Sequence, residues 1–262
     1  MDASVSLMVV TVVCMAVCYL VCGIPFGLII GRLSGNVDIR KAGSGNIGTT
    51  NALRVAGPKV AALTLLFDCL KGVLGVLIGR WAIAAFGYCA GASIMDPGAS
   101  GDVLLALVAL SCLYGHIFSP YLKFHGGKGI ATGVGVLFGF CWPLALLHLG
   151  IFIILVAITK YVSVGSITTA ALVPVTVYLL FPQISLSALA IWAVLGWTVV
   201  WAHRGNISRL RAGTESKLSF TKRATKMDSN RHEDRPYRRR FVGHGRSRPC
   251  RRFRRFRCHV GS

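Results

Sequence analysis

The chain has 262 residues, of which 54% are hydrophobic and 15% charged, and its mean hydropathy is +0.63. Soluble domains carry about 25% charged residues, so this composition excludes an ordinary soluble enzyme and indicates an integral membrane protein. The net charge of +20 is concentrated in residues 204–262, which hold nineteen of the 29 Lys and Arg residues but four of the nine acidic ones. The basicity therefore belongs mostly to one tail, and we expect no specific nucleic-acid partner.

The nine cysteines show no CxxC or Cys/His spacing typical of a metal site. Cys14, Cys18 and Cys22 repeat every four residues in an apolar stretch, which is typical of small buried side chains. The sequence therefore predicts no disulfide framework, no metal site and no cofactor.

Apolar runs long enough for membrane-spanning helices follow one another along the chain, since a helix needs about 20 apolar residues to cross a bilayer. The runs are residues 5–31, 57–79, 102–118, 131–159, 165–181 and 185–202. Lys and Arg occur in the segments 32–55 and 119–130, at Lys160 and in the tail. The positive-inside rule places these segments and the C-terminus in the cytoplasm and the N-terminus outside.

The 131–159 run must begin and end on one side of the membrane, because Lys128 and Lys160 flank it. Pro143 interrupts the run, so we expect a broken hairpin of two short helices around Pro143. The alternative, one long tilted span, would place the basic tail outside. The predicted fold is an all-α, polytopic integral membrane helix bundle of about seven transmembrane helices, five of them long.

The predicted organisation has two parts. Residues 1–220 form the membrane-embedded domain. Residues 221–262 lose apolar periodicity, become rich in arginine and are expected to form a basic, disordered tail.

A polar loop between the first two apolar runs combines glycines, side-chain amides and hydroxyls in the segment Gly43-Ser44-Gly45-Asn46-Ile47-Gly48-Thr49-Thr50-Asn51. Such a loop can turn several backbone N–H groups toward one anion, and flanking cations add fixed positive charge. Standing alone it would be interpreted as a flexible polar loop. The flanking cations are Arg40, Lys41 and Arg54, and the candidate phosphate ligands are Gly43, Gly45, Asn46 and Asn51.

A second glycine-rich segment precedes the 131–159 run. Lys128 lies at the predicted start of the next helix, where free N–H groups and the helix dipole favour an anion. The segment is no Walker A loop, because Leu122 and Gly129 stand where that motif needs a glycine and a hydroxyl. Its glycines could alternatively serve close helix packing. The candidate phosphate ligands are Gly126, Gly127, Lys128, Gly129 and Thr132.

A third polar segment, His203-Arg204-Gly205-Asn206-Ile207, follows the last apolar run and by itself is typical of an interfacial anchor. Asp68 and Lys71 fall inside the second run, where ionisable groups are costly, so we expect them to pair and to be structural. The three polar segments share one predicted face and carry many cations but few carboxylates, which is typical of a site for phosphate groups.

In this order the three segments resemble the motifs of the bacterial glycerol-3-phosphate acyltransferase family that uses acyl phosphate. The resemblance covers residues 5 to about 220 and excludes the extension beyond. Two residues depart from the family pattern: Gly205 stands where glutamate is usual, and Thr49 stands where alanine is usual.

The resemblance implies transfer of a fatty acyl group from acyl phosphate to the sn-1 hydroxyl of glycerol 3-phosphate, giving lysophosphatidic acid and phosphate for phospholipid synthesis. It implies a multi-pass acyltransferase of the bacterial inner membrane with its active site facing the cytoplasm. The expected partners are the two substrates and the lipid bilayer, and the expected state is a monomer. The catalytic residues that it implies are Ser44, Arg54, Lys128, His203 and Asn206.

Two other functions fit parts of the sequence. Acyltransferases that use acyl-CoA or acyl carrier protein rely on H-x-x-x-x-D, and none of His116, His125, His148 and His203 has an aspartate five residues later. A membrane transporter of a phosphorylated small molecule would suit broken helices and glycine-rich loops. However, the sequence has no internal repeat, and the predicted phosphate-binding groups all lie at one face.

Overall fold

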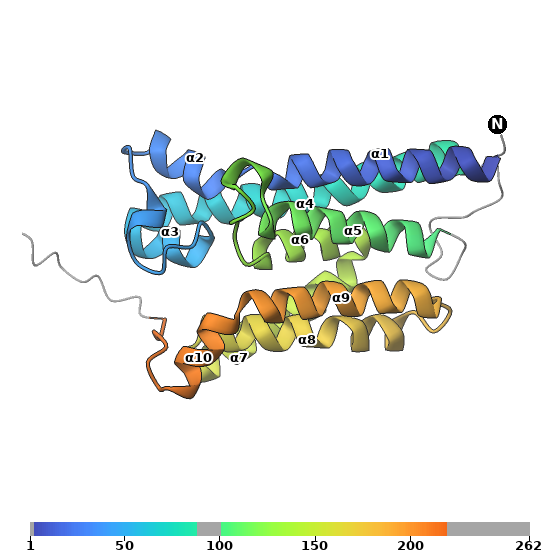
Figure 1. The fold of residues 1–262 in the computed structure, drawn as a ribbon. Helices are drawn as coiled ribbons and strands as arrows, with labels where there is room; N and C mark the ends of the chain where they lie inside the picture. The colour runs from blue at the N-terminus through green and yellow to red at the C-terminus, as the bar shows by residue number, and fades with distance from the viewer. Residues whose placement is uncertain (1–2, 88–100, 219–262) are drawn as a thin grey trace, which may run out of the picture. The chain divides into compact units, whose positions relative to one another are not determined.

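The computed structural model describes residues 3–87 and 101–218, and within these ranges every regular element is a helix (Figure 1). The elements are α1 (Ala3–Gly23), α2 (Phe26–Leu33), η1 (Ile39–Lys41), α3 (Thr49–Ala56), α4 (Pro58–Gly87), α5 (Asp102–Ile117), η3 (Pro120–Leu122), α6 (Ile130–Phe140), α7 (Trp142–Thr159), α8 (Val162–Leu180), α9 (Leu186–Ala202) and α10 (Arg204–Arg211). The predicted all-α membrane bundle is confirmed. The predicted basic tail, 221–262, lies outside the described residues.

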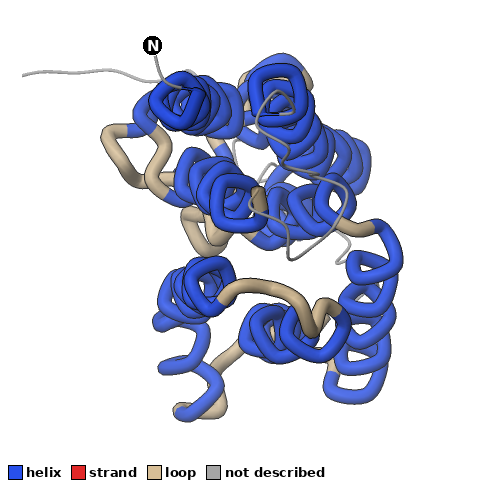
Figure 2. Tube along the Cα trace, turned by 90° about the vertical axis from the view of Figure 1, so that its right-hand side faces the viewer, coloured by secondary structure: helices blue, strands red, loops and turns tan. Residues whose placement is uncertain are grey.

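By length and composition, five segments of the described chain qualify as membrane spans, and a sixth does if α9 and α10, bent by 53°, count as one. Helix α6 is shorter, with 11 residues. The expected count of about seven spans and their orientation stay predictions. Figure 2, which looks along the bundle, shows the long helices packed side by side.

Helices α1, α4 and α5 pack through small residues, as helices in membranes do. A Cβ atom at Gly75 would overlap Cys112, and one at Gly115 would overlap the Tyr19 carbonyl oxygen. Cys18 and Cys22 are fully buried, and their Sγ atoms contact the carbonyl oxygens of Gly75 and Lys71 at 3.2 Å. These cysteines act as the small buried side chains that the sequence predicts.

Helices α6 and α7 form the expected broken hairpin, but the break lies at Cys141 and the second arm has 18 residues. Pro143 does not interrupt a helix; it lies in the first turn of α7, where its missing N–H group costs no helical hydrogen bond. Arg80 Nη1 donates to the Gly139 and Phe140 carbonyl oxygens at 2.8 and 3.1 Å. It thereby satisfies carbonyl groups that the end of α6 leaves without helical partners.

Both ends of this hairpin lie at one end of the bundle. Lys128, just before α6, contacts Asn206 on α10, and the carbonyl oxygen of Lys160, just after α7, accepts a hydrogen bond from Leu218 N at 2.7 Å. Figure 1 shows α3 and α10 at this same end, opposite the start of α1. The three polar segments that the sequence singles out are therefore gathered at one end of the bundle.

Candidate active site

The first glycine-rich loop is shaped from within by Asn51, which is 2% exposed. Its Oδ1 accepts a hydrogen bond from Ser44 N at 2.8 Å, and its Nδ2 donates to the Ile39 and Asn46 carbonyl oxygens at 2.7 and 2.8 Å. A Cβ atom at Gly43, whose φ is +63°, would overlap Asn51 Oδ1. Asn51 therefore holds the loop conformation, and it could bind phosphate directly only by giving up these bonds.

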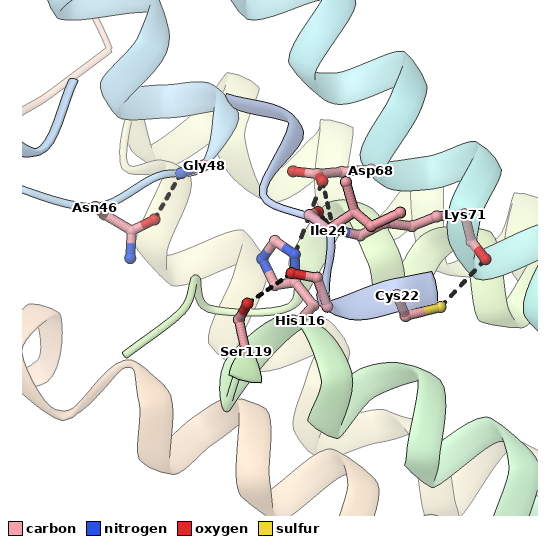
Figure 3. Close-up of polar contacts among 9 residues, drawn as sticks. Cys22, Ile24, Asn46, Gly48, Asp68, Lys71, His116 and Ser119 are labelled. Carbon is pink, nitrogen blue, oxygen red and sulfur yellow. Dashed lines mark hydrogen bonds and ion pairs between the residues drawn. The ribbon is translucent and has the colours of Figure 1, made fainter. Parts of the chain in front are cut away.

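The other groups of this loop differ in what they can offer a ligand. Ser44 is exposed, and since its N–H group is bonded to Asn51, its Oγ is the group that it can present. Asn46 Oδ1 accepts from Gly48 N at 2.8 Å (Figure 3). Among the flanking cations, Arg40 is paired with Asp38 at 2.7 Å.

The second loop docks on the end of α5. Gly126 N donates to the Ile117 carbonyl oxygen at 2.9 Å, and Gly127 N donates to that of His116 at 3.1 Å. A Cβ atom at either glycine would overlap His116. These glycines thus serve close packing in this structure, which is the alternative that the sequence left open.

The start of α6 follows directly. Gly129 precedes α6 with φ +83°, a backbone conformation that favours glycine. Thr132 is fully buried in α6, and its Oγ1 has no hydrogen-bond partner among the described residues. Its predicted part in phosphate binding stays a prediction.

Lys128 links the second loop to the third polar segment. Its Nζ donates to Asn206 Oδ1, and Asn206 Nδ2 donates to Glu215 Oε1 at 2.6 Å. Arg209 Nε donates to Glu215 Oε2 at 2.7 Å. The Glu215 carboxylate therefore holds two donors, Asn206 and Arg209, and Asn206 in turn accepts from Lys128.

The surroundings of Lys128 carry an excess of positive charge. Burial, then the nearby charge of Arg209 and that of Arg54 in the last turn of α3, lower the pKa of Lys128 to about 8, with Glu215 opposing them. Burial alone would raise the pKa of Glu215, but its hydrogen bonds with Asn206 and Arg209 outweigh burial and lower it. Lys128 therefore has two further cations and one ionised carboxylate within electrostatic reach, and this excess of positive charge favours an anion.

His203 lies at the bend between α9 and α10 and is 3% exposed. Its Nδ1 lies 2.8 Å from the Val199 carbonyl oxygen, so Nδ1 carries the hydrogen and Nε2 is left as an acceptor. Burial is the main cause that lowers the pKa of His203 to about 4, and the charge of Lys128 lowers it further. The imidazole is therefore uncharged at neutral pH.

The structure thus brings Lys128 and Asn206 into contact and places Arg54 and His203 within electrostatic reach of Lys128. Ser44, Gly43, Gly45, Asn46 and Asn51 share the first loop, and no hydrogen bond joins them to Lys128 among the described residues. The sequence reasoning did not select Glu215 or Arg209. A usable signal existed, since Glu215 is the only acidic residue between Asp102 and Asp228.

Within residues 3–87 and 101–218, no three His, Cys, Asp or Glu side chains are grouped so that they could hold a metal ion.

Comparison with known proteins identifies the family. A sequence model described as "Glycerol-3-phosphate acyltransferase" matches residues 12–213. Curated proteins of that name from Trichlorobacter lovleyi and Bartonella quintana are 43% and 37% identical to this chain over 185 and 192 residues. The matches span 70% and 73% of this chain and 84% of each relative.

A solved structure agrees with the sequence comparisons. The crystal structure of PlsY (YgiH), an integral membrane glycerol 3-phosphate acyltransferase, in its glycerol 3-phosphate form, matches with a TM-score of 0.67 and 31% identity. The match spans 80% of this chain and 96% of that one. The chain described here therefore belongs to the glycerol-3-phosphate acyltransferase family and is an integral membrane acyltransferase.

Proposed function

We propose that this acyltransferase moves a fatty acyl group from acyl phosphate to the sn-1 hydroxyl of glycerol 3-phosphate. It acts as a monomer in the bacterial inner membrane, with the site facing the cytoplasm. The observation that supports this most directly is that Arg54 and Arg209 lie within electrostatic reach of Lys128, where Glu215 supplies a single carboxylate. Both proposed substrates carry phosphate, and the reaction needs the two anions held side by side.

The reaction is one displacement at the acyl carbon. The substrate hydroxyl oxygen bonds to the carbonyl carbon, the bond from that carbon to the phosphate oxygen breaks, and phosphate leaves with the electron pair. Because the acyl group is already activated, no covalent acyl-enzyme is required. Aligning the two reactants can remove roughly 7–11 kcal/mol of the barrier.

The residues then divide into two roles. Lys128 and Arg54 neutralise the charge that grows on the leaving phosphate, which is an electrostatic contribution to catalysis. Ser44 Oγ and the N–H groups of the first loop bind phosphate oxygens, and Asn206 keeps Lys128 in place through its Oδ1. The loop residues proposed for phosphate binding are Gly43, Gly45, Asn46, Asn51, Gly126, Gly127, Gly129 and Thr132. Asn51, Gly126 and Gly127, whose polar groups are already bonded within the protein, would contribute by shaping the two loops.

The proton of the attacking hydroxyl has two candidate acceptors, His203 and the leaving phosphate. A general base works best when its pKa is near the working pH, and the pKa of His203 is lowered to about 4. The leaving phosphate is therefore the better acceptor, and it departs as hydrogen phosphate. His203 Nε2 is suited to accept a hydrogen bond from the hydroxyl and so to orient it.

The test is a two-donor assay on the purified full chain in detergent. Palmitoyl phosphate and palmitoyl-CoA are offered in parallel with labelled glycerol 3-phosphate, and lysophosphatidic acid is measured. We expect product from the acyl phosphate alone, with the sn-1 position confirmed by analysis of the product. Product from the CoA ester alone would show that acyl-CoA, and not acyl phosphate, is the donor.

The competing function, transport of a phosphorylated small molecule, is tested in the same preparation. Uptake of labelled glycerol 3-phosphate into proteoliposomes, without product from either donor, would favour a transporter. Assays on right-side-out and inverted vesicles, each given external glycerol 3-phosphate, test which side of the membrane the site faces.

A further inference from the structure

A buried polar cluster lies beneath the two glycine-rich loops and takes no part in the chemistry proposed above. It consists of Asp68 and Lys71 on α4 and His116 on α5, each 3% exposed or less (Figure 3). Lys71 Nζ lies 2.7 Å from Asp68 Oδ1, and His116 Nδ1 lies 3.8 Å from the same oxygen. Charged groups in membrane spans are costly, so their retention needs a reason.

One arm of the cluster reaches the first loop. Lys71 Nζ donates to the Ile24 carbonyl oxygen at 2.8 Å, at the break between α1 and α2. Helix α2 begins two residues later, and a Cβ atom at Gly27 would overlap the Ile47 carbonyl oxygen in the first loop. The position of that loop therefore depends, through α2, on where Lys71 holds Ile24.

The other arm reaches the second loop. The His116 carbonyl oxygen binds Gly127 N, and a Cβ atom at Gly127 would overlap His116 Nε2. The backbone that carries Lys128 thus rests directly on the His116 ring. Asp68 lies between the two arms: its Oδ1 is ion-paired with Lys71 and packs 3.8 Å from His116 Nδ1, too far for a hydrogen bond.

We propose that Asp68, Lys71 and His116 are positioning residues that fix the spacing between the two glycine-rich loops, so that Lys128 and the first loop can hold one ligand together. This rests on the proposed site but not on the identity of the acyl donor. Removing one partner of a buried pair leaves an uncompensated charge, whereas replacing both by apolar residues of similar size is often tolerated. Stability and positioning can therefore be separated.

The experiment compares three variants of the full chain, each assayed with whichever acyl donor the unaltered protein uses. Asp68→Leu/Lys71→Met removes the ion pair without leaving a lone charge. Asp68→Lys/Lys71→Asp keeps a pair but turns a carboxylate toward the Ile24 carbonyl oxygen. His116→Phe keeps a ring of similar shape without its nitrogen atoms.

We expect each variant to raise KM for glycerol 3-phosphate at least tenfold, with a smaller fall in kcat, while the thermal midpoint of the double apolar variant stays near that of the parent. His148→Phe is the matched control, because it removes a buried histidine on α7 that pairs with Thr176 at 2.8 Å and contacts neither loop. Its KM should not change.

Two results would overturn the proposal. One is a KM for glycerol 3-phosphate that is unchanged in the double apolar variant or in His116→Phe. The other is a KM in the reversed pair that equals that of the parent protein. If the double apolar variant does not fold, the reversed pair and His116→Phe decide the question by the same criterion. An unaltered protein without acyltransferase activity would instead count against the proposed function.

Discussion

The first glycine-rich loop and the Lys128 network are built in opposite ways. The loop is local: a side chain eight residues from Gly43, that of Asn51, holds its backbone. The network has a long-range link, since Lys128 meets Asn206, 78 residues later in the chain, and Asn206 is in turn bonded to the ionised Glu215 nearby. A loop held by neutral hydrogen bonds is insensitive to pH. The network, in contrast, contains Lys128, whose pKa of about 8 lies close to neutral pH.

Lys128→Ala removes the lysine of the network and should cause the largest loss of activity. Removing a preorganised charge from a site costs about 10²–10³ in rate, and we expect kcat/KM to fall by at least that factor. Thermal unfolding in detergent should show an intact fold, because Lys128 is already partly desolvated as a cation. Near-normal turnover in this variant would show that Lys128 is not part of the active site.

Asn51→Leu removes the side chain that holds the first loop and should cause a somewhat smaller loss of activity. It leaves Ser44 N and the carbonyl oxygens of Ile39 and Asn46 without their partner, at about 1–3 kcal/mol for each group that stays buried. We expect about a hundredfold loss of kcat/KM that does not vary between pH 7 and 9. Asn46→Ala, which removes a single bond to Gly48 N, should lose less, and equal losses would contradict the central role of Asn51.

The pH dependence of substrate binding sharpens the comparison further. Because the pKa of Lys128 is about 8, its charge is largely lost between pH 7 and 9, and KM for glycerol 3-phosphate should rise about tenfold. Lys128→Arg should flatten this rise, since arginine stays protonated. His203 does not titrate in this range because its pKa is about 4.

The stability of the protein should respond to the same titration with the opposite sign. The folded lysine releases its proton near pH 8, while the unfolded one holds it up to its ordinary pKa of 10.5. Between pH 8 and 10.5 the unfolded state therefore binds more protons than the folded state. The free energy of unfolding, measured by chemical denaturation, should consequently increase as the pH is raised through this range. A KM that is flat from pH 7 to 9 in the parent protein would contradict the lowered pKa.

Gly205→Glu should give the smallest effect. Gly205 is exposed in the first turn of α10, and a Cβ atom there would lie 3.6 Å from Arg209 Nη1, so the larger side chain fits. Replacing a helical glycine contributes about 0.5–1 kcal/mol, and an acidic residue in the first turn about 0.3–1 kcal/mol. We expect a slightly higher thermal midpoint and kcat/KM within about twofold; a large loss would show that Glu215 cannot share Arg209.

The fold was largely predictable because apolar run length and the positions of lysine and arginine define the spans and the hairpin. The hairpin breaks at Cys141, close to the predicted place, but the role given to Pro143 was wrong, since proline in a first turn starts a helix as readily as it ends one. The contact of Lys128 with Asn206 could not be predicted, because side chains 78 residues apart meet only through helix packing. For the same reason the sequence leaves two roles open for Gly126 and Gly127, whose close packing on His116 depends on the fold.

The broken hairpin of α6 and α7 has a consequence for biosynthesis. Both of its ends lie at the same end of the bundle, so with the proposed cytoplasmic orientation neither Lys128 nor Lys160 has to be carried through the lipid when the chain is inserted. Moving a lysine into the centre of a bilayer costs about 2.5–3.5 kcal/mol on insertion scales. Under that proposal, the cationic groups assigned to the substrate remain on the side of the membrane where the ribosome delivers them.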